Sequence, residues 1–382
     1  MITRVCYTSR AEMQRAVQFQ DGIDQDAAAD RAIESAADNI DAQLHRRFYP
    51  IDTVRYFDWP NQGGSGGGQY ANPWRLWLDQ WDCVVLTSLT TGGQSIALNQ
   101  AFLEPVNKEE WEPFEYIELD RSTSAAFGGN SVTPQHSIVA IGTWGYGADA
   151  DQVATLAANV LTADTTITVS DGSQAGPGNL LVLGYGRGAA PFPSALGYAG
   201  AVQPYTGERV LITDVAFADT GLAQSGAGCS TASTSDQALT TTGTGALNKG
   251  EVILLDQEQM LVEQIVAGKA TVRRAWNGTT LAAHGSTPEV YALRQYSVLR
   301  AQLGTTATSY SSGAAVFRHR IPPLVRDLSI GEAVNQVLQE GTGYARTVGT
   351  GDAAYPAPGQ DLASKWDEAM TAHGRKARQR AV

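Results

Sequence analysis

Few residues in this sequence stand at a spacing that supports catalysis. Gly63, Ser65 and Gly67 match the G-x-S-x-G pattern of a nucleophilic serine, but that serine requires a strand before it and a helix after it. Here the pattern lies inside the glycine-rich run 63–68, which predicts a flexible loop instead. The sequence also has no G-x-x-x-x-G-K-[ST] motif to hold a phosphate.

The five histidines and three cysteines do not have the spacing of a metal site. No two histidines are four residues apart, as two zinc ligands on one helix face would be. Cys6, Cys83 and Cys229 are odd in number and far apart, which argues against a disulfide framework or a zinc site. Carboxylates are numerous, and nothing selects one pair as an acid and a base. We therefore expect no enzyme activity, no cofactor and no metal.

The one charge cluster lies at the C-terminal end. The last ten residues contain four cations and no acid: Arg375, Lys376, Arg378 and Arg380. Since the formal net charge of the whole chain is −12, the rest of the chain has a net charge of −16. A basic tip on an acidic body indicates contact with an anionic surface, either acidic protein or DNA phosphate. A solvated basic helix end is the alternative interpretation. The spacing does not put all four cations on one face, which argues against base-specific recognition.

Periodic apolar residues predict helices at both ends of the chain. The predicted helices cover residues 9–20, 24–46, 324–340 and 361–379. Ser9 and Glu12 form an S-x-x-E capping box at the first of them. Leu362, Trp366 and Met370 lie on one face of the last, just before the basic tip. Short strand-like runs follow the second helix, up to about residue 143.

Between residues 149 and 320 the sequence becomes rich in Gly, Thr and Ser, with alternating β-branched runs that predict strands. This block contains an internal repeat. Arg274–Thr280 recurs as Arg300–Thr306 at an offset of 26 residues. Glu208–Ile212 resembles Glu258–Val262 more weakly. Duplication of a small strand unit explains both pairs.

Composition and hydropathy place the chain in a non-membrane context. Hydrophobic residues make up 43% and charged residues 17% of the chain, so the charged share is below the roughly 25% of an average domain. No apolar run approaches the ~18 residues of a membrane span, and the N-terminus has no apolar signal core. We expect a protein kept in the cytoplasm, or in a particle assembled there.

The order of several segments resembles the head-to-tail adaptor (connector) family of long-tailed bacteriophages. The segments are the capped first helix, residues 32–41, residues 44–50, the strand ending Trp144-Gly145-Tyr146, and the helix led by Pro322-Pro323. Residues 46–50, 56–60 and 73–78 look most like adaptors from phages of actinobacterial hosts. In small family members the glycine-tyrosine strand leads almost directly to the Pro-led helix, whereas here the β block intervenes.

The resemblance implies an α+β fold, with a discontinuous helical adaptor core built from N- and C-terminal helices with short strands. An inserted, mainly-β domain contains the repeated strand unit. The expected division is 1–148 for the first part of the core, 149–320 for the inserted domain, and 321–382 for the second part. This last part holds the portal-docking helix and the basic tip.

The resemblance also implies a function, a structural protein of the virion neck. The family forms a homo-oligomeric ring, usually a dodecamer, between the portal and a stopper or tail-terminator protein, and double-stranded DNA passes through it without sequence specificity. The expected portal-binding residues are Leu362, Trp366, Met370, Arg375, Lys376, Arg378 and Arg380.

Two alternatives remain open. One is a stopper or tail-completion protein of the same neck, although the helices at both ends argue against it. The other is a carbohydrate-binding tail protein, which should show clustered aromatic residues, whereas the block 149–320 contains a single tryptophan, Trp276.

Overall fold

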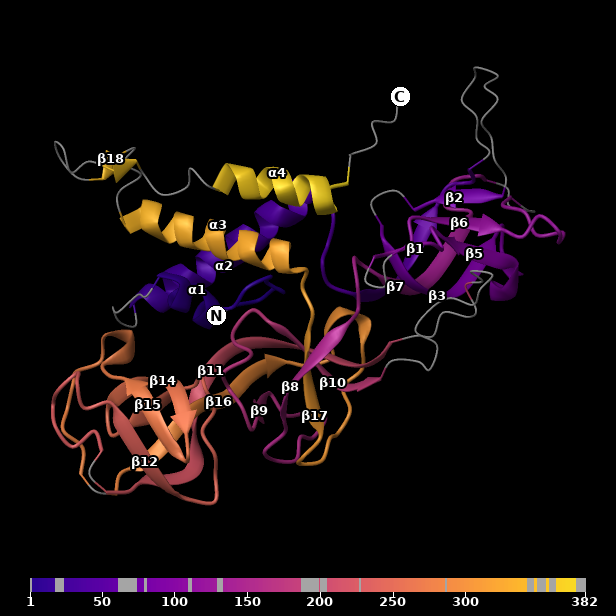
Figure 1. Cartoon of the computed structure of the whole chain (residues 1–382). Helices are drawn as coiled ribbons and strands as arrows, with labels where there is room; N and C mark the ends of the chain where they lie inside the picture. Colours follow the sequence, from indigo (N-terminus) through magenta and orange to yellow (C-terminus); the bar gives the residue numbers. More distant parts are fainter. Residues whose placement is uncertain are drawn as a thin grey trace.

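The protein is mostly β. The computed structural model describes residues 2–17, 24–60, 74–78, 81–108, 112–128, 133–186, 199, 205–226, 228–285, 287–341, 347–348, 355–356 and 362–375. Of these residues 39% are in strands and 22% in helices. The expected α+β fold, with a helical adaptor core and one inserted domain, was therefore wrong. Strands dominate the first part of the chain as well as the block 149–320 (Figure 1).

The helices that the structure describes come from both ends of the chain and pack on one another. They are α1 (Arg10–Val17), α2 (Asp24–Leu44), α3 (Pro323–Gly341) and α4 (Leu362–His373). The predicted capping box is confirmed, since the Ser9 amide donates to the Glu12 carboxylate and the Glu12 amide donates to the Ser9 hydroxyl. Apolar faces of α2 and α3 meet in one buried cluster with Met13, Phe48 and Tyr146.

Residues 51–144 form a separate β unit with its own core. One sheet has the order β1 (Ile51–Phe57), β7 (Ile138–Trp144), β3 (Cys83–Thr91), β4 (Gln94–Ile96), and the other has the order β2 (Arg75–Trp77), β6 (Tyr116–Leu119), β5 (Ala101–Glu104). A short 3₁₀ turn, η1 (Leu98–Gln100), precedes β5. Leu86, Ile117 and Trp144 are among the buried residues between them. These strands form an independent hydrophobic core instead of packing only on the helices, and this is why the fold-class prediction was wrong.

The remaining long sheet is built from β8 to β17. Its strands are β8 (Ala150–Thr155), β9 (Thr166–Thr168), β10 (Leu180–Gly186), β11 (Thr206–Gln224), β12 (Ala238–Gly243), β13 (Val252–Leu255), β14 (Glu258–Val266), β15 (Lys269–Arg273), β16 (Glu289–Leu299) and β17 (Ala315–His319). A two-stranded ribbon, β18 (Thr347–Val348) and β19 (Tyr355–Pro356), lies after α3.

Six of these strands close into a barrel, which we call barrel B. The order β11-β12-β15-β14-β13-β16 returns to β11 through the direct pairing of β11 with β16. Only the C-terminal part of β11 and the N-terminal part of β16 belong to barrel B, since Leu222 pairs with Gly243 on β12 and Ile253 on β13 pairs with Ala292. Its core includes Leu255, Val262 and Val272.

The other halves of β11 and β16 belong to a second unit of the same design, barrel A. Its order β8-β9-β16-β11-β10-β17 repeats the pairing order of barrel B, and a bridge from Leu156 to Val169 joins β8 to β9. The chain therefore leaves barrel A along β11, builds all of barrel B, and returns along β16. The repeated unit is thus six strands in size, larger than the small strand unit expected from the sequence, and one copy is inserted into the other (Figure 1).

The repeated sequence motif forms the same buried ion pair in both barrels. In barrel B, Arg274 donates two hydrogen bonds to Glu258, at 2.8 and 2.7 Å, and the amides of Ala275 and Ala282 donate to the same carboxylate. In barrel A, Arg300 binds Glu208 at 2.6 and 2.7 Å, and the Ala301 and Thr308 amides complete the set.

The turn after each arginine has the same unusual backbone. These turns are η3 (Trp276–Gly278) in barrel B and η4 (Gln302–Gly304) in barrel A. Ala275 and Ala301 both adopt a left-handed conformation, with φ of 52° and 54°. Non-glycine residues rarely adopt positive φ, so the glutamate that binds the alanine amide in each barrel stabilises the turn.

Candidate functional site

Most of the expected portal-binding residues that the structure describes are engaged within the chain. Leu362 and Trp366 on α4 are partly buried against the helical cluster, and the Trp366 indole donates to Glu332 on α3. Met370 is 44% exposed. Lys376, Arg378 and Arg380 lie outside the described residues. Whether this segment binds a portal stays a prediction, and on the described part of α4 Met370 is the large apolar side chain that is exposed.

Arg375 reaches a buried carboxylate in the first β unit. Its guanidinium lies 3.0 Å from Asp82, and its amide donates to the carbonyl of Leu44 at the end of α2. Nearby, the Tyr146 hydroxyl meets His373 at 3.0 Å. The end of α4 is thus joined to α2, to the residues after β7 and to the loop before β3, and the first cation of the basic tip serves an internal contact.

Asp82 is the buried centre of this contact. Its side chain is 2% exposed and lies between Arg375 and Arg46, the latter at 3.3 Å. Burial raises the pKa of Asp82, and the two arginines oppose that rise. A buried carboxylate of this kind is stable only with its cations in place, so Asp82 depends on both chain segments for its pairing.

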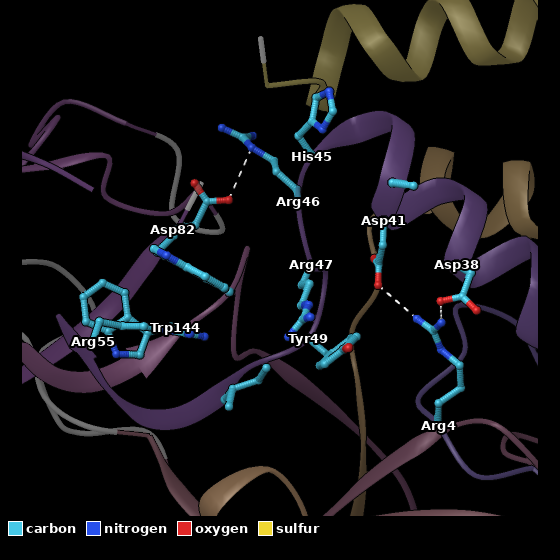
Figure 2. A pocket seen from close by; sticks show the side chains of 14 residues that line it. Arg4, Asp38, Asp41, His45, Arg46, Arg47, Tyr49, Arg55, Asp82 and Trp144 are labelled. Atoms are coloured by element: carbon cyan, nitrogen blue, oxygen red, sulfur yellow. Dashed lines mark hydrogen bonds and ion pairs between the residues drawn. The ribbon is translucent and has the colours of Figure 1, made fainter. Parts of the chain in front are cut away.

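A cavity of about 600 Å³ opens beside Asp82, between the C-terminal end of α2 and the β1–β7 sheet (Figure 2). We call it the junction cavity. Its lining residues are Arg4, Asp38, Asp41, Ala42, His45, Arg46, Arg47, Tyr49, Ile51, Arg55, Trp81, Asp82, Trp144 and Gly145. Four arginines and three aspartates therefore share one recess, together with aromatic and aliphatic walls.

One side of the junction cavity is a closed ionic network. Arg4 binds Asp41 at 3.0 Å and also pairs with Asp38, and the buried Tyr7 hydroxyl donates to Asp41. Burial raises the pKa of Asp41, while Tyr7 and Arg4 oppose the rise. The charges on this side are satisfied within the protein.

Two further arginines of the cavity, Arg47 and Arg55, lie outside these ion pairs. Arg55 on β1 stacks over the indole of Trp81 at 3.4 Å. Its Nε atom is buried and, like those of Arg4 and Arg46, has no hydrogen-bond partner among the described residues. Burial, together with the nearby charge of Arg47, lowers the pKa of Arg55. Within the described ranges, neither Arg47 nor Arg55 forms an ion pair, so these two side chains are suited to bind an anion.

Sequence reasoning did not find this site. In the sequence, Arg47 belongs to residues 44–50, which carry the resemblance, and neither Arg55 nor Trp81 has a spacing that singles it out. Arg55 and Trp81 come from different elements, β1 and the loop before β3. No local spacing joins them, and only the folded chain brings them together.

The other residues that could carry chemistry lie elsewhere. The glycine-rich run 63–68 lies outside the described residues. Cys6, Cys83 and Cys229 are buried free thiols, and burial raises their pKa values. His284 is buried between Asp256 and Glu258, at 2.7 and 2.9 Å, as part of the barrel B ion-pair cluster. In the described part of the chain, no group of three or more His, Cys, Asp or Glu side chains is arranged to hold a metal.

Comparisons with known proteins identify no family for the chain. No protein-family model, no curated protein and no solved structure matches it. Among the described residues, no helix is both long and apolar enough to cross a membrane.

Proposed function

We propose that this chain is a head-to-tail adaptor of a long-tailed bacteriophage. In this role it is a non-enzymatic subunit of a ring, usually of twelve copies, in the virion neck. The portal lies on one side and a stopper or tail-terminator protein on the other, and DNA passes through the centre. The proposal rests on the resemblance described from the sequence.

One structural observation supports the proposal above others. The segments that carry the resemblance are far apart in the sequence but meet in one hydrophobic cluster. It joins Ile33 and Ile40 of α2, Phe48, Tyr146 after β7, and Leu328 of the Pro-led α3. About 180 residues separate Tyr146 from Leu328. Segments that resemble one family in order are thus neighbours in space, as parts of a common unit would be.

Two measurements test the proposal. Negative-stain microscopy of the purified chain, alone and mixed with the portal protein from the same phage, should show closed rings in at least the mixture. Quantitative mass spectrometry of the virion should give a copy number that matches the ring. One or two copies per particle would contradict the proposal, as would tailed, infectious particles assembled without this protein.

A further inference from the structure

Some of the arginines that line the junction cavity form ion pairs within the protein and others do not. Of the four arginines that line it, Arg4 and Arg46 each pair with aspartates. Arg47 and Arg55 form no ion pair in the described part of the chain, although the charge of Arg47 acts on Asp41, and the two arginines repel each other. Arg47 is exposed and Arg55 is half-buried, so it is chiefly the Arg55 charge that an anion in the recess would compensate.

Arg55 is held in a fixed orientation. Trp81 covers one face of its guanidinium at 3.4 Å, which is the usual geometry for a cation over an aromatic ring. Stacking of this kind restricts the planar group, and Arg55 is one of the residues that line the cavity. A guanidinium edge matches the two oxygens of a carboxylate. Arg47 stands between Arg55 and Arg4 (Figure 2).

We propose that the junction cavity binds an acidic peptide segment of a protein partner. One Glu or Asp of that segment binds between Arg47 and Arg55. A neighbouring apolar side chain of the same segment contacts Ile51, which lines the same cavity. This site would exist whether or not the chain is an adaptor, because it depends only on the cavity and its two unpaired arginines.

Two features favour a carboxylate over a phosphate group of nucleic acid. The cavity lies at the C-terminal end of α2, where the backbone carbonyls disfavour a multiply charged anion. Phosphate sites are instead common at helix N-termini. Asp38, 72% exposed in its side chain, also stands at the cavity. A DNA strand that carries one charge per nucleotide would meet this carboxylate as well as the arginines.

The test compares two labelled peptides by fluorescence anisotropy on the full chain. One alternates Glu with Phe, and the other alternates Gln with Phe and so keeps the apolar groups without the charge. We expect the Glu peptide to bind at least about tenfold more tightly, since one charged hydrogen-bonded contact contributes about that factor to the affinity. Equal binding of the two peptides, or no binding of either, would overturn the proposal.

Variants then assign the binding to the cavity. Arg47→Gln and Arg55→Gln should each lower the affinity for the Glu peptide by about tenfold. Neither substitution should change the affinity for the Gln peptide. Arg31→Gln is the matched control, because Arg31 lies on α2 outside the cavity with a side chain 64% exposed, and it should change nothing. Inorganic phosphate and a 20-base-pair DNA duplex serve as competitors. If the duplex binds through the same two arginines and displaces the peptide, the occupant is nucleic acid and the proposal fails.

Discussion

The duplicated ion pair gives the sharpest prediction about stability. Glu258 in barrel B is buried, with a side chain 0% exposed, and it accepts hydrogen bonds from Arg274 and from two backbone amides. Glu258→Gln removes the negative charge and leaves Arg274 buried without an ionic partner. Breaking a buried pair from one side costs ~3–5 kcal/mol. We expect a loss of that size in the free energy of unfolding of barrel B.

The pKa of Glu258 gives an independent figure for the same interaction. Burial raises the pKa, but hydrogen bonds from Arg274 and the Ala282 and Ala275 amides outweigh burial and hold it at about 2, below the ordinary 4.5. A lowered pKa means that the folded state favours the ionised form, at ~1.4 kcal/mol per unit of difference. Ionisation of Glu258, with all of its hydrogen-bond partners, therefore stabilises the fold by on the order of 3 kcal/mol at neutral pH. That contribution is complete above pH 4.5 and is lost as the pH falls towards 2.

The free energy of unfolding is measured by urea denaturation. Hydrogen exchange is then measured for the backbone amides of the peptide that contains Ala275 and Ala282. Hydrogen exchange localises the effect to barrel B, which matters because the chain has several units. Glu263→Gln is the matched control, since Glu263 pairs with Arg273 on the same barrel but both side chains are partly exposed, at 35% and 42%. Such a pair contributes less than ~1 kcal/mol. If the two substitutions cost the same, the ion pair is not what holds the turn and the reasoning is refuted.

Three further predictions concern the contacts between units. Asp82→Asn should weaken the attachment of the α4 end, because it leaves two arginines around a neutral group, and limited proteolysis should then release the C-terminal segment faster than in the native chain. Trp366→Ala should lower the free energy of unfolding by ~2–3 kcal/mol through lost packing, whereas Met370→Ala should change it by less than ~0.5 kcal/mol. If thermal denaturation gives the same change in melting temperature for both variants, α4 does not pack through Trp366. Gly304→Ala should separate barrel A from β1, because the new methyl would lie 2.1 Å from the Asp52 carbonyl oxygen at a φ of +87°, and unchanged exchange of the β1 amides would rule this out.

Much of the local structure could be predicted from the sequence. The helix at Arg10–Val17 has a capping box that acts between residues three apart, and α2 and α3 have apolar faces at helical spacing. The repeat at residues 274–280 and 300–306 was visible because both copies keep the same letters at a constant offset. These signals are short-range, or they repeat, and a single sequence records both.

The arrangement of strands could not be predicted in the same way. β1 pairs with β7, so Ile51 lies opposite Trp144 although the two are far apart in the chain. Register shifts in β3 between Cys83 and Val85 further interrupt the alternation that a strand pattern needs. The separate core of this unit was therefore missed, and the fold class with it. The junction cavity was missed for the same reason, since its residues belong to separate elements.

The two barrels share one design but differ in the surroundings of the conserved turn. In barrel A, Arg209 donates to the carbonyl of Leu303 on η4 and also pairs with Asp52 on β1, and Leu303 packs against the helical cluster. The matching positions in barrel B are Gln259 and Asn277, and the Asn277 side chain donates a hydrogen bond to the Gln259 side chain.

The repeat thus kept the glutamate–arginine pair that forms the turn and changed the residues that the turn presents outward. A leucine and an arginine make the turn of barrel A a contact with the rest of the protein, since an apolar side chain and a buried ion pair both need a partner surface. An asparagine and a glutamine make the same turn in barrel B compatible with water. This difference explains why barrel A joins the helices and the first β unit, while barrel B extends away from β1 and β7 (Figure 1).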